Sequence, residues 1–65
     1  MKSYERIKQY LEDNGIKQKY IAEKTGIQEN KLSLTLNGQR IMTADEFIKI
    51  IYVLNLDANK FVYGD

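Results

Sequence analysis

The chain of 65 residues is short enough to be a single domain, and 43% of its residues are hydrophobic, which is typical of a globular protein. It contains no cysteine and no histidine, which excludes disulfides, the usual zinc sites and catalysis by either residue type. No apolar run approaches the ~20 residues of a membrane span, and the N-terminus has no signal-peptide apolar region. We therefore expect a cytoplasmic protein without a metal or cofactor.

The formal net charge of +1 is too small to indicate nucleic-acid binding by itself. Its distribution is more informative, because residues 1–15 are neutral, residues 16–40 carry +3 and residues 41–65 carry −2. A basic middle third is compatible with a nucleic-acid partner. Ordinary scatter of surface charge would give the same pattern.

Glycines and cap residues divide the first half of the chain into three predicted helices. Ser3 is the predicted N-cap of a first helix that ends near Asn14, and Gly15 follows as the residue that ends it. A second helix is predicted over about 18–24 and a third over about 29–36. The residues expected to face inward are Tyr4, Ile7, Leu11, Ile21, Ala22, Leu32 and Leu36.

The second half of the chain is predicted to add two more helices. The segment 43–46, Thr-Ala-Asp-Glu, has the form of a capping box and opens a fourth helix that ends near Leu54. Asp57 is the predicted cap of a short fifth helix over 58–62, with Phe61 facing inward. The spacing of a core stripe places four residues of the fourth helix inward, namely Phe47, Ile50, Ile51 and Leu54. The sequence thus predicts one all-α domain over 1–65, with five helices and no sheet.

The segment 18–37 is the most informative part of the sequence. Two short helices joined by a tight turn that contains a glycine form a helix-turn-helix unit. Ala22 supplies a small residue where the two helices cross, and Gly26 tolerates the positive φ that the turn requires. Aliphatic residues that would hold the crossing from both sides are Ile21, Ile27 and Leu32.

This segment resembles the helix-turn-helix of the lambdoid phage repressor and Cro family, also called XRE-like regulators. The resemblance spans about 4–61 and is carried by Gln18, the Ile21-Ala22 pair, Gly26, the stretch KLSLTLNGQR from Lys31 to Arg40, and the stretch DEFIKIIYVLNLDANKF. It implies a lambda-repressor-like domain whose helices 2 and 3 form the helix-turn-helix. Thr25 and Thr35 depart from the aliphatic residues usual in the family, and Leu34 departs from a polar or basic one.

The resemblance implies that the third helix enters the major groove of double-stranded DNA, where Gln and Asn pair with adenine and Glu accepts from cytosine. The implied base-contacting residues are Gln28, Glu29, Asn30, Ser33 and Leu34. The implied phosphate-contacting residues are Lys17, Gln18, Lys19, Lys31, Asn37, Gly38 and Arg40. From the residues alone, Gln28 as a plain cap, Glu29 as a favourable charge at a helix N-terminus and Lys31 as ordinary surface charge remain alternatives.

Apolar residues outside the predicted core stripe suggest a homodimer surface. Ile48, Tyr52 and Val53 lie off that stripe, and Val62 and Tyr63 follow the fifth helix without an evident core position. We expect Tyr52, Val62 and Tyr63 to form the dimer contact on a palindromic operator. The alternative is that these residues wrap the back of a small core.

The predicted function is a sequence-specific, Cro- or repressor-like transcription regulator, either a complete protein or the N-terminal part of a longer repressor. An alternative is a protein-interaction module of the same shape, such as an antitoxin or a polymerase-binding phage protein, which the weak net charge, Glu29 and Leu34 favour. An enzyme is not expected, because the sequence has no nucleophile–base pair at a recognisable spacing and no glycine-rich phosphate loop. Neither a membrane nor a small-molecule substrate is expected as a partner.

Overall fold

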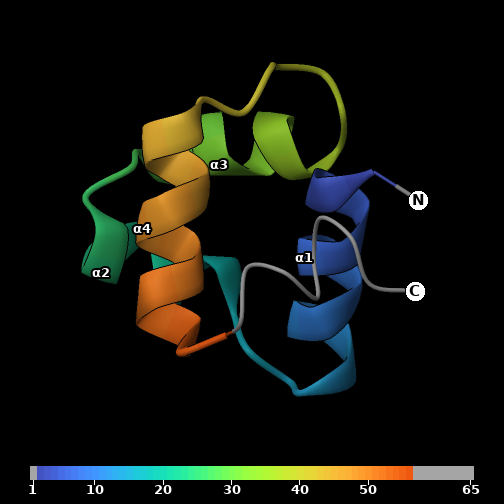
Figure 1. Ribbon diagram of the computed structural model, residues 1–65, viewed down its shortest axis with the longest axis vertical. Helices are drawn as coiled ribbons and strands as arrows, with labels where there is room; N and C mark the ends of the chain where they lie inside the picture. The colour runs from blue at the N-terminus through green and yellow to red at the C-terminus, as the bar shows by residue number, and fades with distance from the viewer. Residues whose placement is uncertain (1, 57–65) are drawn as a thin grey trace.

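The computed structural model describes residues 2–56, which form four helices and no strand. They are α1 (Ser3–Asp13), α2 (Gln18–Thr25), α3 (Glu29–Leu36) and α4 (Ala44–Leu54) (Figure 1). The all-α prediction is confirmed for these residues, with four helices in place of the five predicted. The predicted fifth helix over 58–62, with Asp57 and Phe61, lies outside the described residues.

Helix α1 begins one residue earlier than the sequence predicts. Lys2 is the N-cap in extended conformation, so Ser3 lies in the first turn and the predicted Ser3 cap is wrong. The reason is Glu5, whose carboxylate accepts a hydrogen bond of 2.7 Å from the N–H of Lys2 and so closes the helix start from the third helical position. At the other end Gly15 has a φ of +64°, as expected for the residue that follows a helix.

The turn between α2 and α3 depends on Gly26 and Thr25. Gly26 has a φ of +80°, and its N–H donates to the carbonyl of Ala22 at 2.9 Å. Thr25 Oγ1 donates to the carbonyl of Ile21 at 2.7 Å and accepts from the N–H of Ile27 at 3.3 Å. The threonine therefore closes the end of α2 with its hydroxyl, which an aliphatic residue in the same position could not do.

Helix α4 starts with the capping box that the sequence predicts. Thr43 Oγ1 accepts from the N–H of Glu46 at 3.1 Å, and Glu46 Oε1 accepts from the N–H of Thr43 at 3.0 Å. This reciprocal pair satisfies two N–H groups that the helix itself leaves without a partner. It also fixes the direction in which the carboxylate of Glu46 leaves the helix.

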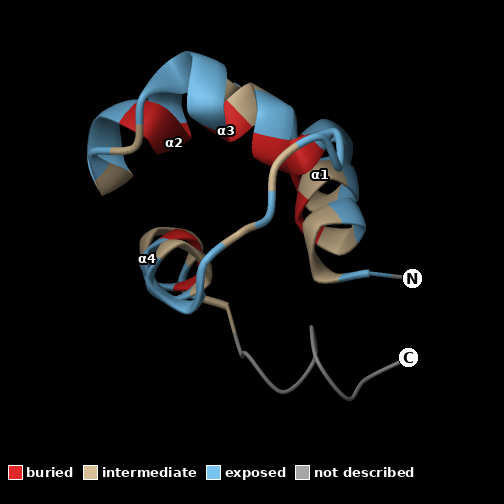
Figure 2. Cartoon of the chain, turned by 90° about the horizontal axis from the view of Figure 1, so that it is seen from above, coloured by how far each residue is buried: buried red, intermediate tan, exposed pale blue. Residues whose placement is uncertain are grey.

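The core lies inside an arc formed by α1, α2 and α3, and α4 fills the open side. Figure 2 shows the buried parts of α2 and α3 on the inner side of the arc and exposed residues on its outer side. The buried cluster consists of Ile7, Leu11, Ile21, Ala22, Leu32, Leu36 and Ile50. Phe47, Leu54 and also Val53 are partly buried and pack against it, so the expectation that Val53 lies off the core is wrong.

The four helices are short, and none of them in the range 2–56 is long and apolar enough to cross a membrane. Helix α2 contacts both α3 and α4, and α3 also contacts α1. Helix α3 is thus held from two sides. Its remaining side is the outer face of the arc.

Candidate nucleic-acid interface

The outer face of α3 carries the side chains predicted to read bases. Gln28, Glu29 and Asn30 are exposed, and Leu34 keeps 42% of its surface accessible. Ser33 is half-buried. The opposite face holds Leu32, Thr35 and Leu36, each at most 2% exposed. The residue pattern thus divides α3 into a buried face and a face turned to solvent, as a helix that enters a groove requires.

Gln28 occupies the N-cap position of α3, but its side chain makes no capping hydrogen bond. The side-chain amide is therefore available to an external partner, and an amide can pair with the N6 and N7 atoms of adenine. Glu29 lies in the first turn of the same helix, where a carboxylate is favoured by the helix dipole. Gln28 and Glu29 can therefore occupy the start of α3 and contact an external ligand at the same time.

The start of α2 also faces outward. Lys17 is its N-cap through the backbone, and no side chain caps this end of the helix. Gln18 is half-buried, and Lys17 and Lys19 on either side of it are exposed. Two ammonium groups beside an uncapped helix N-terminus form a favourable environment for a phosphate.

The end of α3 is joined to α1 by side chains that sequence reasoning did not connect. Lys8 Nζ donates to Asn37 Oδ1 at 2.6 Å, and Asn37 Nδ2 donates to the carbonyl of Ser33 at 2.9 Å. The N–H groups of Asn37 and Gly38 donate to the carbonyls of Ser33 and Thr35. These backbone donors are thus used inside the protein, and Lys8 brings a positive charge to this end of the helix instead.

Arg40 has a structural partner that the sequence did not predict. Its guanidinium donates from Nη1 to Glu46 Oε1 and from Nη2 to Glu46 Oε2, both at 2.9 Å. Nη1 also donates to Thr35 Oγ1 at 2.8 Å. Arg40 therefore ties the segment after α3 to the buried face of α3 and to the first turn of α4. A phosphate contact by Arg40 remains a prediction.

This network has an electrostatic signature. Hydrogen bonding to Arg40, together with the N–H of Thr43, lowers the pKa of the Glu46 carboxyl to about 2. The same hydrogen bonding, donated by Arg40 to Glu46, raises the pKa of Arg40 above its usual value. Both groups are consequently charged at neutral pH, and Glu46 neutralises the guanidinium beside α3.

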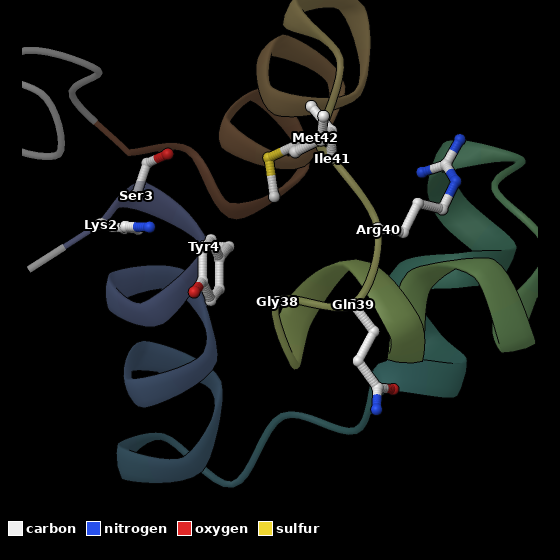
Figure 3. Close-up of a pocket in the computed structure, with 8 residues that line it drawn as sticks. All are labelled: Lys2, Ser3, Tyr4, Gly38, Gln39, Arg40, Ile41 and Met42. Carbon is white, nitrogen blue, oxygen red and sulfur yellow. The ribbon is translucent and has the colours of Figure 1, made fainter.

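The segment after α3 packs closely on the N-terminal end of α1. Gly38 has a φ of +77°, and Figure 3 shows the ring of Tyr4 extending from α1 toward it. A Cβ atom on Gly38 would lie 2.7 Å from the hydroxyl oxygen of Tyr4. Beside this contact is a cavity of about 430 Å³ that Lys2, Ile41 and Met42 help to line, while the side chain of Arg40 points away from Tyr4.

One comparison with known proteins found a match. A family model described as a helix-turn-helix domain matches residues 4–64. The chain belongs to this XRE-like helix-turn-helix family. No curated protein and no solved structure matched the chain.

Membership of the helix-turn-helix family indicates a DNA-binding regulator in general terms. Helices α2 and α3, which Gly26 joins, are the pair predicted from the sequence to form the helix-turn-helix. The predicted base contacts share the outer face of α3. The predicted phosphate contacts lie at the start of α2 and along α3 and the segment that follows it.

The predicted dimer residues are only partly within the described chain. Tyr52 on α4 is 84% exposed and Ile48 is 61% exposed. They belong to the outer side of α4 in this helix-turn-helix domain. Val62 and Tyr63 lie outside the described residues.

Proposed function

We propose that this helix-turn-helix protein is a sequence-specific transcription regulator of the repressor or Cro type, which inserts α3 into the major groove of double-stranded DNA. The observation that carries the proposal is the composition of the outer face of α3, where Gln28, Glu29 and Asn30 are exposed beside a buried Leu32. Amide and carboxylate groups have the hydrogen-bonding capacity to distinguish base pairs in the major groove. Regulation would follow from occupancy of the operator, in the compartment that holds the DNA.

The proposal includes a homodimer on a palindromic operator. A single short recognition helix contacts few base pairs, and domains of this kind gain affinity by binding two half-sites about one helical turn apart. Tyr52 and Ile48 supply exposed apolar surface on α4 for the contact between the two copies.

Selection of bound duplexes from a random pool tests the proposal. We expect the wild-type protein to select a palindromic consensus and the Asn30→Ala variant to select a different base at one position of each half-site, because Asn30 is proposed to read that base. The Lys31→Ala variant should select the wild-type consensus and bind every duplex more weakly, since a phosphate contact carries no sequence information. Selection of no consensus by the wild type would reject the proposed function.

One observation favours a second candidate, a protein-interaction module such as an antitoxin. Leu34 leaves 42% of its surface exposed in the middle of the outer face of α3, where it could equally contact an apolar partner surface. Binding to mixed duplex DNA at increasing salt separates the two candidates. A phosphate-binding domain loses affinity steeply as salt increases, whereas an interaction module binds DNA weakly at every salt concentration.

A further inference from the structure

A polar cleft of about 350 Å³ lies beside the turn of the helix-turn-helix. Its walls come from three parts of the chain, namely the turn between α2 and α3, the first half of α3, and α4 with the segment before it. Its lining includes Gln28, Lys31, Arg40, Glu46 and Lys49. We call it the turn-side cleft.

The turn-side cleft has an excess of positive charge. It contains three cationic side chains and one carboxylate, and that carboxylate is fully engaged by the bidentate ion pair between Arg40 and Glu46. Lys31 and Lys49 are both exposed, and the side-chain ammonium group of neither makes a hydrogen bond or an ion pair within the range 2–56. Two uncompensated ammonium groups from different helices therefore border one polar hollow.

The turn-side cleft lies beside the helix that is proposed to bind DNA, so its positive charge can contact the DNA backbone. Gln28 and Lys31 belong at once to the turn-side cleft and to the helix proposed to enter the major groove. A helix in that groove is flanked by the phosphates of both strands, so the flank of α3 beside α4 faces one of the two backbones. Lys8 and Asn37 occupy another side of α3, against α1.

We propose that the turn-side cleft binds a phosphate group of the DNA backbone, held between Lys31 on α3 and Lys49 on α4. This inference rests on the proposed function and adds Lys49 as a DNA-contacting residue. A phosphate carries the charge and the acceptor oxygens that two ammonium groups can share. Arg40 bonds to Thr35 on α3 and to Glu46 on α4, and so joins the two helices beside the cleft.

Affinity for duplex DNA as a function of salt tests the cleft. The Lys49→Gln variant should bind about 5- to 10-fold more weakly than the wild type near 0.1 M salt. The slope of the logarithm of the binding constant against the logarithm of the salt concentration should also become shallower by about 0.9 per protomer, because one phosphate contact is lost. The loss should be the same for operator and unrelated duplexes. Lys49→Arg should restore most of the affinity, since it keeps the charge.

Lys24→Gln is the matched control. Lys24 lies on α2 with its ammonium 5.7 Å from the centre of the Tyr20 ring, and it does not line the cleft. The variant removes the same charge and should bind DNA as the wild type does. Unchanged thermal melting of the Lys49→Gln variant would show that the affinity change does not come from unfolding.

The outcomes separate the cleft from the proposed function. If the wild type binds DNA with a steep salt dependence but Lys49→Gln behaves like Lys24→Gln, the cleft proposal is wrong and the proposed function stands. A wild type that fails to bind DNA at low salt rejects both. A further measurement is a titration of the wild type with inorganic phosphate, followed by the amide chemical shifts of Gly26 and Gln28. If free phosphate saturates the cleft while the Lys49→Gln variant binds DNA as the wild type does, the cleft binds a free anion and not the DNA backbone.

Discussion

At the scale of single residues, Thr35 explains how a polar side chain fits into the core. It is 2% exposed, its hydroxyl donates to the carbonyl of Lys31 at 2.8 Å, and it accepts from Arg40 at the same distance. A buried hydroxyl that both donates and accepts a hydrogen bond does not destabilise the core. The threonine that looked like a departure from an aliphatic position is the anchor of Arg40 on α3.

Gly38 is the residue at which a small substitution should have a large effect. Gly38→Ala adds a Cβ atom at a φ of +77° and at 2.7 Å from the Tyr4 hydroxyl oxygen, so both the backbone and the packing are strained. The positive φ costs about 1 kcal/mol and the end of the Tyr4 side chain must shift as well, so we expect the free energy of unfolding to fall by about 2 kcal/mol. Denaturant unfolding followed by circular dichroism measures this change.

Gly15→Ala is the control for the contribution of the backbone alone. Gly15 has a φ of +64°, but a Cβ atom there would meet nothing within 4 Å. The Gly15→Ala substitution should lower the free energy of unfolding by about 1 kcal/mol. Equal losses in the two variants would show that Tyr4 does not restrain the segment after α3.

At the scale of helices, local signals predicted most of the secondary structure. Gly26, the capping box at Thr43 and the spacing of apolar residues fixed α2, α3 and α4 to within a residue, because each signal acts over a single turn of the chain. The predicted start of α1 was wrong by one residue, because serine is a more favourable N-cap residue than lysine and Ser3 was therefore chosen. Glu5 at the third helical position favours Lys2 instead.

The link between Arg40 and Glu46 could not be predicted in the same way. The two residues are six apart, and Arg40 lies in the connection after α3 whereas Glu46 lies in the first turn of α4. Only the path of that connection brings the guanidinium to the carboxylate. The sequence therefore offered Arg40 as a free cation, and the structure shows it in an internal ion pair.

This ion pair predicts a pH dependence of stability. The pKa of Glu46 is lowered from its usual 4.5 to about 2 by hydrogen bonding to Arg40. Since the folded pKa is the lower one, the pair stabilises the protein fully above about pH 4.5 and loses its effect as the pH falls toward 2. We expect Glu46→Gln to lower the free energy of unfolding by about 2 kcal/mol at pH 7 and by almost nothing at pH 2.

Asp45→Asn is the matched control for this measurement. Asp45 is an exposed carboxylate in the same first turn of α4, and it makes no ion pair with the part of the chain that the structure describes. Its substitution should change stability by a few tenths of a kcal/mol, through the helix dipole. A difference between wild type and Glu46→Gln that stays constant from pH 7 to pH 2 would contradict the role given to the Arg40–Glu46 pair.

At the scale of the whole molecule, the candidate interface was predictable where it lies on one helix and unpredictable where several elements build it. The exposed face of α3 follows from the burial of Leu32 and Leu36, which the apolar spacing already indicated. Lys8 and Lys49 were missed because both lie on other helices: Lys8 bonds to Asn37 just after α3, and Lys49 lines the turn-side cleft together with Lys31. Such neighbours depend on tertiary packing, which a linear pattern of residues does not encode.

The outer side of α4 carries the exposed apolar side chains of Ile48 and Tyr52. A cleft of about 280 Å³ lies there, lined by Phe47, Ile48, Ile51, Tyr52, Asn55 and Leu56. Tyr52 is 84% exposed, so its side chain adds little to the stability of one copy. A large aromatic side chain in this position is instead well suited to a contact between copies.

The Tyr52→Ser variant tests this contact. If Tyr52 lies at the centre of a dimer interface, the substitution should weaken self-association about 10-fold or more, because an aromatic side chain buried at an interface commonly contributes 2 kcal/mol or above. Analytical ultracentrifugation of the free protein and of its complex with an operator duplex measures the change. Tyr20→Ser removes a tyrosine that is 49% exposed on α2 and should leave the association unchanged. A wild type that stays monomeric at high concentration and on DNA would show that the two half-sites are not bound by a Tyr52-mediated dimer.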